Sequence, residues 1–402
     1  MNRILKFRKY LDFSKIRYGD QEYIVVNCML GLSKEPTLIH SSMAQALAGL
    51  LMGVPETEFK YFLAKSFPIK QVSEFVEMLD RLKLLESEEV DKEITDLKRQ
   101  YISLQEREPW LQGKSFPEDR SSRVQYINEL LAQVDQEKKF EADAIILPHI
   151  DFQRGWQVYA ETIKSVKIPD HKRFAVLIGT DHKAGSNLVA VCNKPYKIDG
   201  FRIDIDYSGV QFLTERAGDW ILEDMIHHKT EHSLEITLPF LETVWSDHIK
   251  AIPILVGAVE QYRKHEELAR DPQFSRFTNA LAEYLSDKLN ETVLILGIDF
   301  SHLGRSFGDP FEISDELLVN TQQFDSNVKL SFEGQKSAFL FDNFVADNLR
   351  QKVCGFSTMV LLREVFDRLG VKIEPFMGRY RQAVNRSNEC VVTFWGSAYR
   401  FS

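Results

Sequence analysis

Three histidines follow directly after apolar stretches of this chain, where strands are expected to end. His149 stands in LPHIDF, His182 in IGTDHK and His302 in LGIDFSHLG. In an open α/β sheet, ligands bind beyond the carboxyl ends of the strands. We therefore expect the three imidazoles at one edge of one sheet. The spacing between His149 and His182 fits one strand–helix–strand unit, so both can reach one metal ion if their strands are adjacent.

A third ligand would decide which metal such a site holds. A carboxylate would complete the facial triad of non-heme Fe(II) enzymes, which leaves coordination positions open for substrate and oxygen. A thiolate would favour Zn(II), Cu(I) or Fe(II). The candidate thiolate is Cys354, just before an expected helix whose N-terminus favours the anionic form. Most free cysteines are small buried hydrophobic residues, and the residues alone favour that interpretation of Cys354.

The elements that would hold these groups follow from the apolar pattern. Near-continuous apolar strands alternate with amphipathic helices, which predicts an α/β sheet covered on both faces. The expected strands cover residues 143–150, 173–181, 249–257, 292–300 and 389–401, and the expected helices cover 155–166 and 266–290.

The first part of the chain has a different pattern. A strand followed by three short helices predicts a small α+β, winged-helix-like domain over residues 1–86. A helical extension without a binding role is the alternative. The strand is expected at 22–30 and the helices at 41–53, 56–67 and 69–86.

A polar stretch separates this domain from the rest of the chain. Residues 87–108 have few apolar positions and predict a charged connecting helix that Pro109 ends. The remaining residues, 109–402, would form the metal-binding domain.

The composition excludes several classes of protein. The chain has 50 Lys and Arg against 59 Asp and Glu, a net charge of −9, whereas a dedicated nucleic-acid binder has a basic excess. We find no apolar run long enough to span a bilayer, and the start MNRILKFRKYLDF lacks the apolar core of a signal peptide. Four scattered cysteines without CxxC spacing favour a cytoplasmic protein. We expect a homo-oligomer only because symmetric assemblies are common.

Six stretches between about residues 108 and 401 resemble motifs of the Memo family, which is related in fold to the class III extradiol ring-cleaving dioxygenases. Their order and spacing imply the family's mixed sheet flanked by helices. Within the family, the chain resembles protein B of the AmmeMemoRadiSam system. The stretches are GKSFPED (113–119), LPHIDF (147–152), IGTDHK (178–183), EHSLEITLPFL (231–241), LGIDFSHLG (296–304) and VCGFST (353–358).

The resemblance implies a metal site. In Memo proteins two strand-end histidines and a cysteine hold the metal, which implies His149, His182 and Cys354 as ligands here. Fe(II) is the first expectation for the metal, and Cu or Zn are alternatives. In the related dioxygenases a carboxylate replaces the cysteine, so ring cleavage does not follow from the resemblance.

The resemblance also implies an oxygen-dependent or redox enzyme that acts on an organic substrate or a peptide, although catalysis itself is left open. One alternative is a non-catalytic protein that sequesters iron or copper. Another is a scaffold, because bacterial Memo proteins often occur with a radical-SAM enzyme and an AMMECR-type protein, which would be its partners.

Further residues of the motifs suit proton transfer or support of the ligands. His232 and His302 are candidate general acid/base groups, because imidazoles titrate near neutrality. Asp299 would orient an imidazole, or else form a strand-end capping pair with His302. Glu235 would hold His232 one helical turn away, or would be solvated. The other histidines, expected at the surface, are His40, His171, His227, His228, His248 and His265.

Two positions depart from the Memo motifs. Asp151 stands where the family has a glycine, and Asp181 stands where it has a serine. Either carboxylate could orient an imidazole, bind the metal or bind a cationic substrate group. An aspartate also restricts a turn that glycine adopts freely. Our hypothesis is that Asp151 gives the site a harder, more oxygen-rich set of ligands.

Residues 1–86 carry a second, more generic resemblance, to the small PqqD-like or winged-helix domains of peptide-modifying systems. The features that suggest this resemblance are the stretch YGDQEYIVVNCMLGL, the apolar helix and the stretch LDRLKLLE. This resemblance implies that the edge of the strand at 22–30 receives a peptide by strand addition.

Overall fold

The computed structural model describes residues 3–33, 35–135, 138–183, 187–387 and 389–402. These residues divide into two compact units. The first comprises Met1–Ser103 with Arg305–Gly308, and the second comprises Leu104–Gly304 with Asp309–Ser402. The expected domain limits, residues 86 and 108, lie on either side of helix α4 (Glu88–Ser103), and the division falls where α4 ends.

The first unit contains an antiparallel sheet with the strand order β2-β3-β4. Its middle strand is β3 (Gln21–Cys28), which confirms the strand predicted at 22–30. Strands β2 (Leu11–Tyr18) and β4 (Thr37–His40) pair with β3 along its two sides. The expectation that β3 offers an edge to a peptide is therefore wrong, because both of its edges are already hydrogen-bonded.

Three helices follow this sheet, as predicted. They are α1 (Ala44–Met52), α2 (Glu56–Ala64) and α3 (Ile69–Arg81). Gly53 ends α1 with a φ of 87°, a conformation that glycine adopts without strain. The core of the unit lies between the helices and the sheet, and includes Leu5, Val26, Leu47, Leu50, Phe59, Val76 and Leu79. A short pair, β1 (Ile4–Leu5) with β5 (Val54–Pro55), ties the start of the chain to α2.

The second unit is built on a mixed sheet, which has ten strands among the described residues. Five neighbouring strands are parallel, in the order β12-β13-β9-β14-β7. Strand β14 is TVLILG, buried at every residue, as expected of a strand with layers on both sides. The bounds are β12 (Phe201–Ile205), β13 (Lys250–Val256), β9 (Phe174–Thr180), β14 (Thr292–Gly297) and β7 (Ala144–Leu147).

Antiparallel strands extend this sheet on both sides and make it mixed. Strand β17 (Cys390–Phe401) pairs with β7, and both β15 (His302–Gly304) and β16 (Ile373–Asn385) pair with β17. At the other side β11 (Tyr196–Ile198) pairs with β12, and β10 (Val189–Val191) pairs with β13. The predicted mixed sheet flanked by helices is confirmed.

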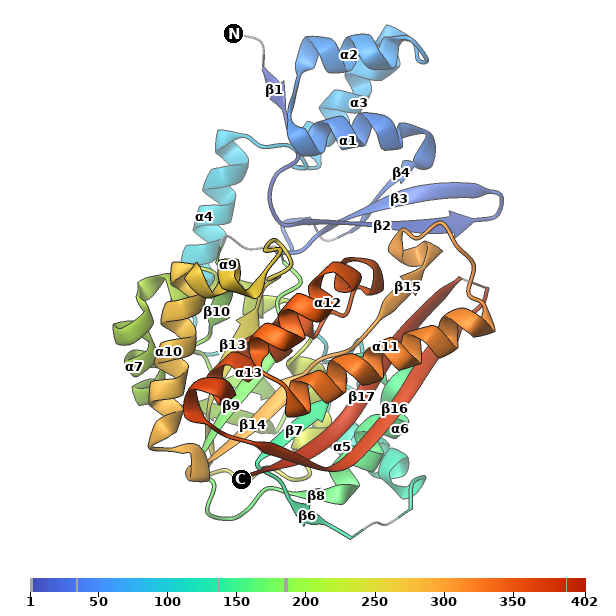
Figure 1. The fold of residues 1–402 in the computed structure, drawn as a ribbon. Helices are drawn as coiled ribbons and strands as arrows, with labels where there is room; N and C mark the ends of the chain where they lie inside the picture. Colours follow the sequence, from blue (N-terminus) through green and yellow to red (C-terminus); the bar gives the residue numbers. More distant parts are fainter. Residues whose placement is uncertain (1–2, 34, 136–137, 184–186, 388) are drawn as a thin grey trace. The chain divides into compact units, whose positions relative to one another are not determined.

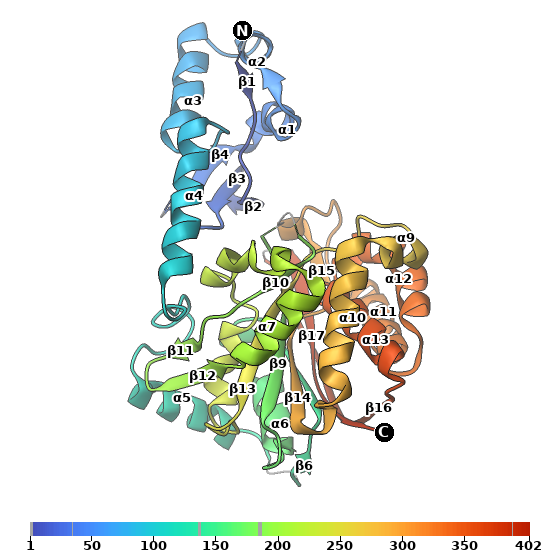
Figure 2. The same ribbon diagram turned by 90° about the vertical axis from the view of Figure 1, so that its left-hand side faces the viewer.

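Helices cover both faces of this sheet (Figures 1 and 2). Helices α10 (Pro272–Ser286) and α13 (Phe356–Leu369) lie on one face, and α5 (Arg120–Ala132) and α6 (Phe152–Ser165) lie on the other. The other helices of the unit include α7 (Tyr207–Ala217), α8 (Leu238–Leu241), α11 (Asp315–Gly334) and α12 (Ser337–Gln351).

The helical stretch predicted at 266–290 is broken into α9 (His265–Arg270) and α10. Asp271 accepts hydrogen bonds from the backbone N–H groups of Gln273 and Phe274, and Pro272 opens the new helix. This is the sequence pattern of a helix start, so the break was encoded locally. Across the described residues, we find no helix with the length and apolar character that spanning a bilayer requires.

Candidate metal centre

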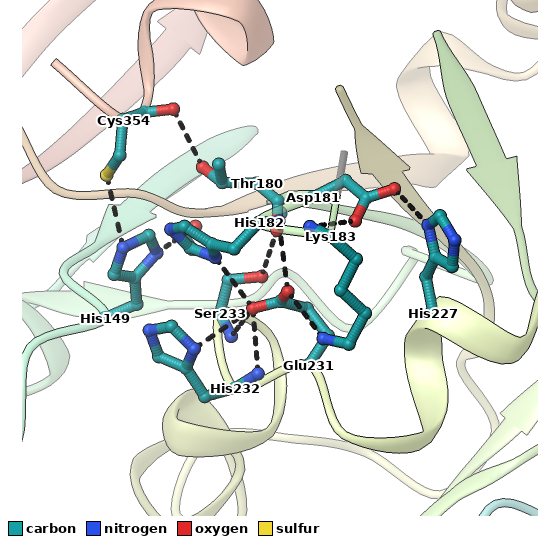
Figure 3. Close-up of polar contacts among 12 residues, drawn as sticks. His149, Thr180, Asp181, His182, Lys183, His227, Glu231, His232, Ser233 and Cys354 are labelled. Atoms are coloured by element: carbon teal, nitrogen blue, oxygen red, sulfur yellow. Dashed lines mark hydrogen bonds and ion pairs between the residues drawn. The ribbon is translucent and has the colours of Figure 1, made fainter. Parts of the chain in front are cut away.

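His149, His182 and Cys354 lie together at the carboxyl edge of the parallel strands (Figure 3). His149 comes two residues after β7, His182 two residues after β9, and Cys354 two residues before α13. One donor atom from each lies within 4.8 Å of the other two. The Cys354 Sγ atom is 3.2 Å from His149 Nε2, and the two imidazole centroids are 5.2 Å apart.

The strands that carry the two histidines have helix α6 between them in the sequence, as predicted, but they are not adjacent in the sheet. Strand β14 lies between β7 and β9. The two rings meet across the end of β14, which is Gly297 and has no side chain there. A Cβ at Gly297 would lie 2.1 Å from the carbonyl oxygen of Ser233. The glycine therefore lets the segment around Ser233 cross the strand end beside the imidazoles.

The surroundings of His149 select one tautomer. Its Nδ1 atom is 3.0 Å from the carbonyl oxygen of Gly297, which can only accept, so Nδ1 carries the proton and donates. The lone pair of Nε2 then faces Cys354. Burial, together with the nearby His232 and His182 rings, holds the pKa of His149 well below its usual value. The ring is neutral, which is the form that binds metals.

His182 is oriented by a buried carboxylate. Its Nδ1 atom lies 3.0 Å from Glu231 Oε1, so Nδ1–H donates and Nε2 is the nitrogen that could bind a metal. Burial acts to lower the pKa of His182, but the negative charge and hydrogen bond of Glu231 outweigh it and raise that pKa.

Glu231 is the centre of the polar contacts in Figure 3. Its oxygens accept from the backbone N–H groups of His182, His232 and Ser233, at 3.2, 2.9 and 3.1 Å. The Lys183 ammonium lies 3.1 Å away. Burial opposes ionisation, but the charges of Lys183 and His182 outweigh it and hold the pKa of Glu231 well below its usual value.

Glu231 and Lys183 were not among the predicted site residues. Glu231 stands directly before His232 in the motif at 231–241, and Lys183 stands directly after His182. Their position beside two predicted histidines was the available signal. Their inward direction depends on the crossing of two segments far apart in the chain, which local patterns do not encode.

His232 lies beside both proposed ligands. Its ring centroid is 5.0 Å from that of His149 and 4.8 Å from that of His182. Its Nδ1 atom is 3.1 Å from Glu231 Oε1, and the side chain is 41% exposed. His182, Glu231 and His232 form a second group of donor atoms within 4.8 Å of one another.

Glu235 has a different role from either expected one. It is fully buried, and its carboxylate lies 2.5 Å from the Arg107 guanidinium. It also accepts from the backbone N–H groups of Trp110 and Leu111, at 2.8 and 2.6 Å. Glu235 therefore anchors the segment 107–111, while Glu231 holds His232.

Asp299 contacts His149 through the backbone. Its Oδ1 atom accepts from the His149 N–H at 2.8 Å, and Oδ2 is 3.8 Å from His149 Nε2. Burial raises the pKa of Asp299 to about 7. The carbonyl oxygen of Asp299 accepts from the Gly355 N–H at 3.1 Å and lies 3.4 Å from Cys354 Sγ. Asp299 thus ties the His149 turn to the Cys354 turn.

His302 lies near the same cluster but is held by main-chain carbonyls. Its Nδ1–H donates to the carbonyl oxygens of Phe300 and Lys352, at 2.9 and 3.2 Å. Desolvation and the neighbouring His182 lower the pKa of His302 to about 4, so its ring is neutral near neutral pH.

Asp151 caps helix α6. Its carboxylate accepts from the Arg154 N–H at 3.1 Å and lies 2.5 Å from the Arg154 guanidinium. Its φ is −59°, so the turn does not need glycine and the expected restriction does not arise.

Asp181 turns away from the proposed ligands toward His227, whose Nδ1 atom is 2.5 Å from Asp181 Oδ2. His227 and His228 are both fully buried, so the expectation that they lie at the surface is wrong. His228 donates from Nε2 to the Ala190 carbonyl oxygen and accepts at Nδ1 from the Tyr196 hydroxyl. Burial lowers the pKa of His228 to about 3.

The expected position of Cys354 just before a helix is confirmed, because α13 begins at Phe356. The expected effect on the thiol is not: desolvation and the charge of Asp299 raise the pKa of Cys354 well above its usual value. A helix N-terminus alone does not make the thiolate the favoured form here. A Cβ at Gly355 would lie 2.7 Å from Ile298, so glycine allows the two turns to meet.

The comparisons with known proteins agree with this architecture. The family model described as Memo-like protein matches residues 107–396, which include the residues of the candidate metal centre. This chain belongs to the Memo family.

Several relatives of this Memo chain are described as MEMO1 family proteins. A MEMO1 family protein of Aquifex aeolicus is 24% identical over 360 residues, with 88% of this chain and 90% of the relative covered. A MEMO1 family protein of Methanosarcina mazei is 24% identical over 267 residues, covering 66% and 87%. The Aquifex match covers more of the chain than residues 107–402 contain, so it extends into the first unit.

Proposed function

We propose that this Memo chain binds one metal ion through His149, His182 and Cys354, and uses it in an oxygen-dependent or redox reaction on a small organic substrate. The observation that carries the proposal is the approach of three donor atoms, from separate segments, to within 4.8 Å of one another. Two imidazoles and a thiolate suit Fe(II), Cu or Zn, of which we expect Fe(II) first.

The hydrogen bonds around the donors support a ligand role. The Nδ1–H groups of His149 and His182 are each bound by an acceptor at 3.0 Å, which leaves both Nε2 lone pairs for an ion. Acceptors of this kind fix the direction of a ligating ring and raise its basicity. His149 is already neutral, so it need not lose a proton to bind.

A bound metal of this class would supply Lewis-acid or electron-transfer chemistry. His232 is the residue that would move protons between the site and solvent, because its ring lies against both histidine ligands and its side chain is 41% exposed. His302 would be a second group for proton transfer and a weak base, because its pKa is lowered to about 4. Asp299 would hold the His149 turn in place.

A cavity favours catalysis over sequestration. It has a volume of about 400 Å³ and is bordered by His182 and Cys354. Such a volume is in the range of small-molecule sites. Sequestration is the second candidate, and it would need ligands that close the coordination sphere. A relationship to extradiol dioxygenases would fit the open site, with a cysteine in place of their carboxylate.

Metal content tests the proposal directly. Protein purified without chelator or affinity tag should contain about one equivalent of metal by mass spectrometry, and His149→Ala and Cys354→Ser should lose it. His171→Ala is the matched control, because His171 is exposed and lies outside the centre. Equal metal content in all four proteins, or none after anaerobic loading, would contradict the proposal. Oxygen uptake under Fe(II) with a substrate panel would then separate catalysis from sequestration.

A further inference from the structure

The cavity beside the metal centre has a distinct chemical character. Its walls include the apolar side chains of Val256, Leu349 and Val353. Leu349 is 63% exposed. His182 and Cys354 line the same cavity. A ligand in this cavity would therefore contact apolar side chains and lie beside the proposed metal ligands.

Glu260 contributes a carboxylate to the same cavity. Its Oε1 atom accepts from the Asn348 side-chain amide at 2.7 Å, and its Oε2 atom lies 3.3 Å from the Ser357 hydroxyl. Both donors are neutral and also line the cavity. Within the described parts of the chain, no Lys, Arg or His side chain forms an ion pair with Glu260. Burial raises the pKa of this carboxyl, as expected for a carboxylate without a cation.

The other charged groups of the cavity are already engaged. Asp181 is bound by His227 and by the Lys183 N–H. The Lys352 ammonium lies 2.5 Å from Asp309. Glu260 is therefore the group that a charged ligand would find without a counter-ion.

We propose that Glu260 selects a cationic substrate, an organic amine whose ammonium binds this carboxylate while its body lies along the apolar wall toward His182 and Cys354. This inference rests on the proposed function, since it names the substrate class of the same centre. Each oxygen of the carboxylate holds one neutral donor and keeps acceptor capacity for an ammonium. A volume of about 400 Å³ suits an amine with one ring or a short aliphatic body.

Three probes with one body and different head groups test the charge preference: phenylpropylamine, phenylpropanol and phenylpropanoate. Their binding is measured by calorimetry on the full chain, both metal-free and metal-loaded. The metal-free measurement avoids direct binding of the carboxylate probe to the metal. We expect the amine to bind about tenfold more tightly than the alcohol, and the acid most weakly, because a desolvated carboxylate favours a cation.

Variants assign the preference to one residue. Glu260→Gln should bring the affinity for the amine down to that for the alcohol. Glu266→Gln, which removes an exposed carboxylate of α9, should leave the preference unchanged. Leu349→Lys is a second variant that spares the interior, because Leu349 is an exposed residue of the cavity lining. The new ammonium would compete with the amine, so this variant should also reduce the preference.

The outcomes separate this inference from the proposed function. Equal affinity for amine and alcohol, or a preference that persists in Glu260→Gln and Leu349→Lys, would overturn the role of Glu260. Metal content, measured on the same samples, decides the proposed function independently. An amine preference in protein that takes up no metal would support the cavity's selectivity and contradict the metal site.

Discussion

At the scale of single residues, Glu231 connects more of the centre than the proposed ligands do. It holds His182 through Nδ1, contacts His232, and pairs with the buried Lys183. A glutamine at this position would keep the shape but lose the charge. The proposed ligands would then lose the group that directs and strengthens one of them.

We therefore predict that Glu231→Gln lowers the affinity for the metal by about ten- to a hundredfold. A competition titration against a chromophoric chelator measures the change. Glu223→Gln, at an exposed carboxylate, is the control and should bind normally. Equal affinities for parent and Glu231→Gln would mean that Glu231 has a structural role only.

Asp325 is a buried carboxyl away from the proposed ligands. It accepts from the hydroxyls of Ser301, Thr393 and Tyr380, at 2.6, 2.6 and 2.8 Å. Burial outweighs these hydrogen bonds and raises its pKa to about 6. The folded state therefore favours the protonated carboxyl. Its contribution to stability is fully present below about pH 4 and is lost as pH rises through about 6.

From this pKa we predict that the parent loses about 2 kcal/mol between pH 4 and 7 relative to Asp325→Asn, which cannot ionise. Urea unfolding of both proteins across this range gives the two curves of free energy against pH. The curves should diverge as the carboxyl of the parent ionises. Parallel curves would show that Asp325 has an ordinary pKa in the folded protein.

At the scale of elements, the start of α6 joins helix stability to the metal centre. Asp151, three residues after Pro148, caps this helix and pairs with Arg154. The geometry supports a capping role, while the hypothesis that Asp151 adds an oxygen ligand concerns the metal. The two roles predict different outcomes for the same substitutions.

We predict that Asp151→Ala lowers the free energy of unfolding by about 1 kcal/mol, the usual loss for an N-cap. Asp151→Ser keeps a capping oxygen without the charge, so its stability should stay close to that of the parent. Metal content of both variants completes the test. If both variants retain a different metal from the parent while Asp151→Ser keeps its stability, the result would favour Asp151 as an oxygen ligand of the metal.

The sequence predicted which segments form strands better than it predicted which strands lie side by side in the sheet. The apolar runs at β9, β13 and β14 identified strands because burial on both faces leaves a continuous pattern. Strand β2 was not predicted because LDFSKIRY has no continuous apolar run, although its partial alternation of apolar and polar residues is typical of a strand with one exposed face. The strand order was also beyond the pattern: β14 follows β9 by more than a hundred residues, yet it lies between β7 and β9.

The metal centre shows the same limit. His149, His182 and Cys354 could be named in advance, the cysteine only through the family resemblance. Glu231 could not be distinguished from Glu235, four residues later, because both stand in one short motif that mixes polar and apolar residues. Which carboxylate faces the histidines depends on how the segment crosses Gly297, and that is a property of the tertiary fold.

At the scale of the whole molecule, the proposed metal ligands all belong to the second unit. That unit has its own large hydrophobic core, which includes Ile178, Ile254, Leu296 and Met359. The first unit has a separate core. Units that have independent hydrophobic cores can fold separately. The metal centre should therefore not depend on the first unit for its ligands or its support.

We predict that a chain starting at Leu104 folds and retains the metal content of the full chain. Circular dichroism measures folding, and mass spectrometry measures the metal, with Cys354→Ser in the same shortened chain as the control. The segment Arg305–Gly308 belongs to the first unit, so the shortened chain keeps this segment but lacks the rest of that unit. We therefore expect a modest fall in melting temperature. A shortened chain that folds but loses its metal would assign the first unit a part in the centre. Retained metal would leave that unit for a separate role, such as recognition of a partner.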